Sequence, residues 1–256
     1  MKNLFNVSGK VAVVTGGSRG IGAMIARGFV ENGVKTYITA RKEEELRATE
    51  RELGALGQCI AIPSDLSTVA GVTAFAAAIT AAEERLHILV NNAGATWGAE
   101  IDDFPESGWD KTMDLNVKSL FFLTQQLLPA LRAAGSKDDP ARVINIGSIN
   151  GITHPHMKNY AYSASKAAVH QLTRHLGADL APQGINVNGI APGFFPSKMT
   201  AHLLPHEAQM AAGFPCGRLG NAEDAAGTAI YLCSRASAWV TGHTLVLDGG
   251  AVANAG

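Results

Sequence analysis

The chain has 256 residues, of which 46% are hydrophobic and 17% charged, and its formal net charge is −1 at pH 7. This length and composition suffice for a large buried core, and the balanced charge excludes a general attraction to nucleic acid or acidic membranes. The widely spaced cysteines Cys59, Cys216 and Cys233 form neither a disulfide framework nor a metal-binding pair.

Short apolar runs alternate with longer amphipathic stretches, which is the pattern of βαβ units. The first five apolar runs are nearly continuous in Val, Ile and Leu, as in parallel strands buried on both faces. We predict strands at 10–15, 34–40, 58–62, 87–91, 141–147, 185–190 and 244–248, and helices at 20–32, 42–54, 67–84, 108–134, 159–181, 198–212 and 221–236. The sequence therefore predicts one α/β domain over 1–256, with a doubly wound, mostly parallel seven-stranded sheet.

A glycine-rich turn, Thr15-Gly-Gly-Ser-Arg-Gly-Ile-Gly22, connects the first strand to the first helix. Glycine permits positive φ and close approach of a pyrophosphate, and a helix N-terminus offers unpaired N–H groups. By itself such a turn is weak evidence, and a plain strand-to-helix connection is the alternative. Its position after the first strand favours a dinucleotide site formed by Gly16, Ser18, Arg19, Gly20, Ile21 and Gly22.

The end of the second strand indicates which dinucleotide binds. An acidic residue there binds the ribose hydroxyls of NAD, but the sequence reads Ile38-Thr-Ala-Arg-Lys42. Ala40 leaves room for a 2′-phosphate, and Arg41 and Lys42, together with Arg19, supply cations suited to it. We therefore predict NADP(H); the alternative is that these cations only begin a charged helix surface.

Tyr162 and Lys166 are four residues apart in the predicted helix 159–181, so their side chains lie on one face. Tyrosine ordinarily titrates near ~10, and a neighbouring cation lowers its pKa, which would suit it to general acid–base catalysis. Tyr160 is a rival, but Ala164, not a lysine, lies four residues after it. Tyr160 is therefore expected to be a packing residue or a pocket wall.

Together these motifs resemble the short-chain dehydrogenase/reductase superfamily in its single-domain, Rossmann-type form, over nearly the whole chain. Asn91-Asn-Ala-Gly94, Val143-Ile-Asn-Ile-Gly-Ser148 and Asp248-Gly-Gly250 match further elements of the family in the right order. The resemblance implies that Asn116, Ser148, Tyr162 and Lys166 are catalytic. It also implies cofactor contacts at Asp65, Leu66, Asn92, Ala93, Gly94, Tyr162, Lys166, Pro192, Gly193 and Ser197, the last of which replaces a threonine found in many relatives.

Within the superfamily the chain is similar to NADPH-dependent 3-oxoacyl reductases. The resemblance implies hydride delivery to a ketone carbon while Tyr162 protonates the oxygen and Ser148 holds it. Lys166 would lower the pKa of Tyr162 and bind the nicotinamide ribose, and Asn116 would hold a water molecule. The alternatives are an NAD(P)-dependent alcohol dehydrogenase working oxidatively and a non-catalytic dinucleotide-binding protein, which the four retained residues disfavour.

Residues 193–214 follow the sixth strand and are expected to form a substrate lid, the alternative being an ordinary pair of surface helices. Substrate-pocket candidates are Trp97, His154, His156, Phe194, Phe195 and Met199, each equally ordinary as a core, loop or interface residue. The two histidines lack a third ligand, so no metal site is expected. The chain shows neither a signal peptide nor an apolar run of ~20 residues, which predicts a cytoplasmic protein. The family implies a homotetramer, or a homodimer.

Overall fold

Seven strands form a single sheet in the computed structural model, which describes residues 2–154, 157–196 and 207–254. The strands are β1 (Val11–Thr15), β2 (Lys35–Thr39), β3 (Cys59–Ala61), β4 (Ile88–Asn91), β5 (Ala141–Ile146), β6 (Ile185–Pro192) and β7 (Thr244–Leu247). Their order is β3-β2-β1-β4-β5-β6-β7, and every neighbouring pair is parallel. The predicted doubly wound sheet is thus confirmed, and it is parallel throughout the described strands.

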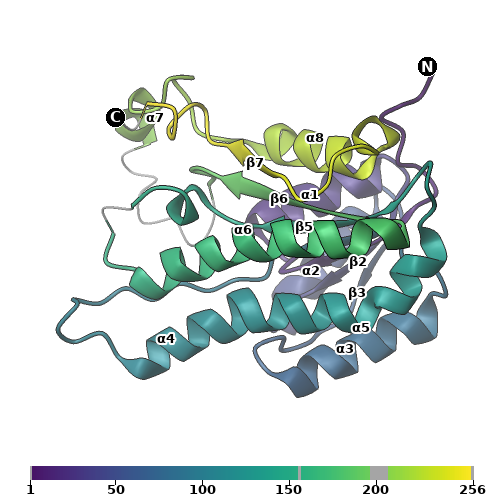
Figure 1. Ribbon diagram of the computed structural model, residues 1–256, viewed down its shortest axis with the longest axis horizontal. Helices are drawn as coiled ribbons and strands as arrows, with labels where there is room; N and C mark the ends of the chain where they lie inside the picture. The colour runs from purple at the N-terminus through teal and green to yellow at the C-terminus, as the bar shows by residue number, and fades with distance from the viewer. Residues whose placement is uncertain (1, 155–156, 197–206, 255–256) are drawn as a thin grey trace.

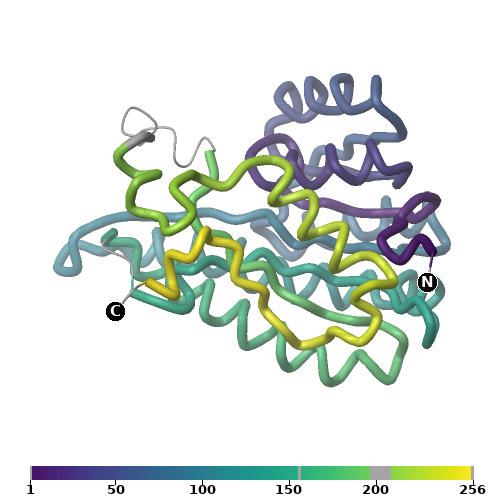
Figure 2. The backbone as a smooth tube through the Cα atoms, turned by 90° about the horizontal axis from the view of Figure 1, so that it is seen from above, coloured from purple at the N-terminus to yellow at the C-terminus, as the bar shows by residue number. Residues whose placement is uncertain are grey.

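Helices cover both faces of this sheet (Figures 1 and 2). They are α1 (Gly20–Glu31), α2 (Glu43–Gly54), α3 (Val69–Ala82), α4 (Glu106–Met113), α5 (Ser119–Ala134), α6 (Tyr160–Leu180), α7 (Glu207–Ala212) and α8 (Ala222–Cys233). One apolar core joins the sheet to α1, α2 and α8, and a second joins it to α3, α5 and α6. Burial of both faces explains why the strands read as continuous apolar runs rather than as alternating ones.

A π-helical turn at Asp114–Lys118 joins α4 to α5, so the predicted helix over 108–134 is present but contains a π turn that the sequence did not predict. The wider turn changes the phase of the side chains that follow it, and Asn116 lies inside it. Such turns are rare and often occur at functional sites. The sequence pattern missed it because the apolar periodicity continues on both sides. Of the predicted helix 198–212, only α7 falls within the described residues.

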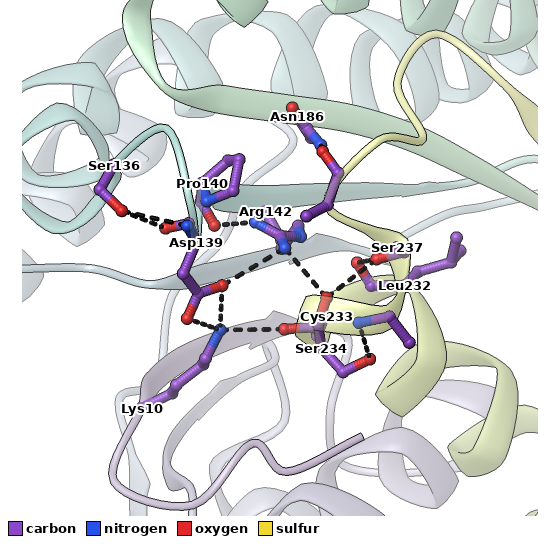
Figure 3. Close-up of polar contacts among 12 residues, drawn as sticks. Lys10, Ser136, Asp139, Pro140, Arg142, Asn186, Leu232, Cys233, Ser234 and Ser237 are labelled. Atoms are coloured by element: carbon purple, nitrogen blue, oxygen red, sulfur yellow. Dashed lines mark hydrogen bonds and ion pairs between the residues drawn. The ribbon is translucent and has the colours of Figure 1, made fainter. Parts of the chain in front are cut away.

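A largely buried cluster of charges lies at the end of the sheet where strands β1 and β5 begin (Figure 3). Asp139 accepts from Lys10 Nζ at 2.9 Å and from Arg142 Nη2 at 3.3 Å. The same two cations donate to the carbonyl oxygens of Cys233 (3.1 Å) and Ser234 (2.9 Å). Carbonyls at a helix C-terminus lack helical partners and carry partial negative charge. This ion cluster of Lys10, Asp139 and Arg142 therefore fastens the end of α8 to the sheet.

Candidate active site

A cavity of about 560 Å³ lies at the carboxyl ends of the strands. The strand order reverses between β1 and β4, and open α/β sheets bind ligands beside such a reversal. The predicted residues that line this cavity are Gly16, Ser18, Arg19, Gly20, Ile21, Arg41, Leu66, Asn92, Ala93, Gly94, Ser148, Tyr162, Lys166, Pro192, Gly193 and Phe195. One cavity therefore brings together the glycine-rich turn and the predicted acid–base residues.

The glycine-rich turn needs its glycines for conformation and for space. Gly16 and Gly20 have φ of +64° and +55°, in the left-handed region that favours glycine. A Cβ on Gly22 would overlap the side-chain nitrogen of Asn92 and the carbonyl oxygen of Gly16. Helix α1 begins at Gly20 with no acidic side chain in its first turn. Its positive N-terminal end and bare backbone thus suit a phosphate.

Thr15 organises this turn, although the sequence analysis did not single it out. Its hydroxyl oxygen accepts the backbone N–H groups of Asn92 and Ala93, both at 2.9 Å. Asn92 in turn donates from Nδ2 to the carbonyl oxygens of Thr15 (2.8 Å) and Gly16 (3.2 Å). These bonds join the ends of β1 and β4, so two walls of the cavity are held together.

The end of the cavity beside β2 is cationic. Arg19, Arg41 and Lys42 line it, and Ala40 occupies the place where an acidic residue would bind ribose hydroxyls. Glu45 of α2, which the sequence analysis missed, lies among them. It accepts from Arg19 Nη1 at 2.9 Å and from Lys42 Nζ at 3.2 Å. An anion bound here would compete with this carboxylate for both cations.

Tyr162 and Lys166 both face the cavity, as their spacing predicts, and Ser148 faces it from the end of β5. Lys166 Nζ lies 5.5 Å from the centroid of the Tyr162 ring and donates to the carbonyl oxygen of Ile146 at 2.7 Å. Burial lowers the pKa of Lys166 to about 8.

The pKa of Tyr162 moves in the direction opposite to the expected one. Burial raises this pKa above the ordinary tyrosine value, and a hydrogen bond from the Ser148 hydroxyl offsets only part of that rise. The lowered pKa expected from the neighbouring Lys166 is therefore wrong for this site. Removal of the phenol from water is the largest influence on this pKa, so Tyr162 holds its proton at neutral pH.

Asn116 lies behind the cavity rather than on its wall. Its Oδ1 accepts from the backbone N–H of Ala95 at 2.8 Å. Its Nδ2 donates to the carbonyl oxygen of Ala95 at 3.0 Å and to the hydroxyl of Ser165 at 2.9 Å. The side chain thus links the π-helical turn to the segment after β4 and to α6. Its role in holding a water molecule stays a prediction.

Several predicted residues lie away from the main cavity. Asp65 is outside its lining, and the Asp65 carboxylate accepts the backbone N–H of Ser67 at 3.0 Å. Trp97 packs against Gly108, and Lys111 Nζ lies 5.1 Å from the centroid of the Trp97 ring.

Of the other substrate-pocket candidates within the described residues, only Phe195 lines the main cavity. His154 is exposed and lies outside its lining. Phe194 lines a neighbouring cavity of about 310 Å³, which Phe195 also borders. His156, Ser197 and Met199, and much of the predicted lid, lie outside the described residues.

The described ranges contain neither a metal-binding cluster nor a membrane-spanning helix. There, no three His, Cys, Asp or Glu side chains are close enough together to hold a metal ion. None of the helices in those ranges combines the length and the apolar character that crossing a membrane requires.

A phosphate-binding turn and a Ser–Tyr–Lys set around one cavity define a dinucleotide-dependent oxidoreductase. The chain belongs to the short chain dehydrogenase family, whose model matches residues 10–208. It is 49% identical to the rhamnolipid-biosynthesis 3-oxoacyl-acyl-carrier-protein reductase of Pseudomonas aeruginosa, with 98% of this chain and 99% of that protein covered. It is 33% identical to a gluconate 5-dehydrogenase of Gluconobacter oxydans, with 97% and 96% covered.

Solved structures agree with this assignment. The fold is similar to that of the Pseudomonas aeruginosa RhlG/NADP active-site complex, with a TM-score of 0.94, 49% identity, and 98% and 99% of the two chains covered. It is also similar to a gluconate 5-dehydrogenase from Burkholderia cenocepacia in complex with NADP and tartrate, with a TM-score of 0.89, 32% identity, and 98% of each chain covered.

Proposed function

We propose that this protein is an NADPH-dependent reductase that converts a ketone, a 3-oxoacyl thioester or another medium-sized carbonyl compound, into a secondary alcohol. The observation that carries the proposal is the single cavity lined by the glycine-rich turn, Arg41, Ser148, Tyr162 and Lys166. The Pseudomonas aeruginosa relative supports it, because it is named a 3-oxoacyl-acyl-carrier-protein reductase and its solved structure is an NADP complex.

The residues at one end of the cavity fit a dinucleotide that carries a 2′-phosphate. The backbone of Gly20 at the N-terminus of α1, which lines the cavity, suits the pyrophosphate, and Arg41 beside Ala40 suits the 2′-phosphate. When bound, NADPH supplies the hydride that the ketone carbon accepts. The protein contributes orientation and the proton.

Tyr162 is the proposed proton donor to the ketone oxygen. Burial raises its pKa, which makes the phenol a weaker acid but keeps it protonated at neutral pH, so it holds the proton that the ketone oxygen can take as it gains negative charge. The Ser148 hydroxyl donates a second hydrogen bond to the same oxygen, where negative charge develops in the transition state. Lys166 supplies positive charge beside the phenol and is expected to hold the nicotinamide ribose hydroxyls.

The raised pKa of Tyr162 also bears on the oxidative direction, the first of two alternative functions. Oxidation of an alcohol needs Tyr162 as a base, and its raised pKa disfavours the phenolate at neutral pH. A non-catalytic dinucleotide-binding protein would not need Ser148, Tyr162 and Lys166 on one cavity. The homotetramer, the cytoplasmic location, the substrate lid and the adenine contact of Asp65 stay predictions.

A panel of ketones, including 3-oxoacyl thioesters of increasing chain length, tests the proposal by following NADPH oxidation. We expect turnover of at least one ketone at neutral pH, with slower oxidation of the matching alcohol by NADP⁺. Absence of turnover on every ketone, or faster alcohol oxidation at the same pH, would contradict the proposed direction.

Arg41→Ala is expected to raise the KM for NADPH about tenfold or more, because a charge-assisted hydrogen bond contributes ~1.5–3 kcal/mol. The KM for NADH should change little, since NADH carries no 2′-phosphate. The matched control is Arg51→Ala, which removes a cation from the last turn of α2. Equal effects of Arg41→Ala on the two cofactors would refute the phosphate assignment.

The pH dependence of kcat/KM for reduction follows from Lys166. Its ammonium is charged below its pKa of about 8 and neutral above it. We therefore expect kcat/KM to fall as pH rises through about 8, because the positive charge beside Tyr162 is lost. A profile that stays level up to about pH 10, the ordinary lysine range, would contradict this assignment.

A further inference from the structure

His170 is a buried imidazole beside the proposed active site, with no part in the chemistry described above. It lies on α6, four residues after Lys166 and eight after Tyr162, and therefore on the same helix face. Only 5% of its surface is exposed. Buried histidines need partners for both ring nitrogens, so its contacts indicate what it does.

The His170 ring contacts the segment that carries Ser148. Nε2 accepts the backbone N–H of Ser148 in a long hydrogen bond of 3.4 Å. The backbone of Gly151, at the end of the 3₁₀ turn Ile149–Gly151, acts on the other side of the segment to raise the pKa of the ring. Because Nε2 is the acceptor, the neutral ring carries its proton on Nδ1. One side chain of α6 thus meets the serine segment at both of its ends.

Gly147 allows this close approach. A Cβ at Gly147 would overlap the Nε2 of His170, so the imidazole occupies the space that any side chain at position 147 would need. The Gly147 N–H donates to the carbonyl oxygen of Ile190 at 2.7 Å, which fixes the backbone against β6. The imidazole of α6 is therefore packed against a backbone segment that its hydrogen bond to β6 holds in place.

The hydroxyl of Ser148 takes its orientation from the same turn. Its oxygen accepts the backbone N–H of Asn150 at 3.1 Å, and both Ser148 and Tyr162 line the cavity. A shift of the segment 147–151 would move this hydroxyl relative to Tyr162. Misplacement by ~1 Å can cost about a hundredfold in rate.

We propose that His170 is a positioning residue, which holds the segment Gly147–Gly151 so that the Ser148 hydroxyl faces the Tyr162 phenol. The expected loss of rate on removing His170 depends on the proposed reductase function, whereas the contact between His170 and the serine segment does not.

The proposal requires the neutral ring. A second proton, on Nε2, would place two N–H groups against each other at Ser148. Burial and the cations Lys166 and Arg174 of α6 lower the pKa of His170, while the Gly151 carbonyl acts in the opposite direction. Strand β5 and the turn after it face the ring with backbone groups of Gly147, Ser148 and Gly151. The contact is thus present at neutral pH and lost as pH falls below the ordinary histidine range.

The test compares His170→Leu, which removes the hydrogen bond to Ser148, with His170→Gln, whose amide can still accept from it. We expect His170→Leu to lower kcat about ten- to hundredfold with little change in the dissociation constant of NADPH, measured by fluorescence titration. The kcat of His170→Gln should be close to the wild-type value. It should not fall at acidic pH as the wild-type kcat does, because the glutamine side chain does not titrate. His175→Leu is the matched control, since His175 lies on the same helix with 71% of its side chain exposed.

Hydrogen exchange at residues 147–151 decides the inference independently of turnover. Exchange there should accelerate in His170→Leu and not in His170→Gln or His175→Leu. If the wild-type protein reduces no ketone, the proposed function fails, and the exchange data still support or overturn the positioning role. Unchanged exchange and kcat in His170→Leu would overturn it. So would equal losses of rate and NADPH affinity in both His170 variants, which would show a packing role only.

Discussion

Tyr162→Phe is expected to lower kcat for ketone reduction about a thousandfold, which corresponds to ~4 kcal/mol of barrier at ~1.4 kcal/mol per tenfold. Phenylalanine keeps the ring that lies beside Lys166 and removes the hydroxyl that Ser148 hydrogen-bonds. The proton for the ketone oxygen must then come from water or a weaker donor. Single-turnover measurement of NADPH oxidation separates this step from product release, and the affinity for NADPH should stay nearly unchanged.

Tyr160→Phe is the matched control for this variant. Tyr160 is 39% exposed, and its ring lies edge-on to Phe104 with 5.8 Å between the centroids. It is two residues from Tyr162 and does not line the main cavity. We expect the kcat of Tyr160→Phe to stay within about twofold of the wild-type value, because exposed substitutions usually change stability by less than ~0.5 kcal/mol. Retention of activity in Tyr162→Phe, or equal losses in both variants, would refute the acid role of Tyr162.

Asp139→Asn is expected to lower the free energy of unfolding by ~2–3 kcal/mol. Removing one partner of a buried ion pair costs ~3–5 kcal/mol, and partial exposure of Asp139 reduces that figure. Asp139 is 35% exposed, whereas the side chains of Lys10 and Arg142 are 10% and 0% exposed. The substitution leaves these two cations close together without a carboxylate. Urea denaturation at equal protein concentration measures the change.

Asp138→Asn removes the same charge from the neighbouring, exposed position. Its unfolding free energy should stay within ~0.5 kcal/mol of the wild-type value. The turn itself should persist in both variants, because the Asp139 backbone bonds Ser136 independently of the carboxylate. Equal stability of the two variants would show that the ion cluster contributes little to holding α8 against the sheet.

Much of the fold could be predicted from the sequence because it depends on short-range patterns. A buried parallel strand needs a continuous apolar run, and all seven predicted strands are present with ends shifted by a few residues. The glycine-rich turn is recognisable because left-handed φ at Gly16 and Gly20 requires particular residue types. The common helix face of Tyr162 and Lys166 follows from a four-residue spacing alone.

The contacts that sequence reasoning missed join residues that lie far apart in the chain. Glu45 meets Arg19 across 26 residues, Thr15 meets Asn92 across 77, and Lys10 meets Asp139 across 129. No local pattern marks such pairs, because they depend on which strand ends and helices the topology places side by side. The bond between His170 and Ser148, 22 residues apart, is of the same kind.

The sequence by itself therefore determined the succession of strands and helices along the chain, the glycine-rich turn, and the candidates Ser148, Tyr162 and Lys166, which the structure brings to one cavity. Tertiary structure alone decided the π-helical turn at Asn116, the residues behind the serine segment and the electrostatics of the site. The pKa of Tyr162 shows the physical reason. Spacing along a helix places a charge near the phenol, but the cost of removing that phenol from water depends on everything packed around it, and here burial raises the pKa.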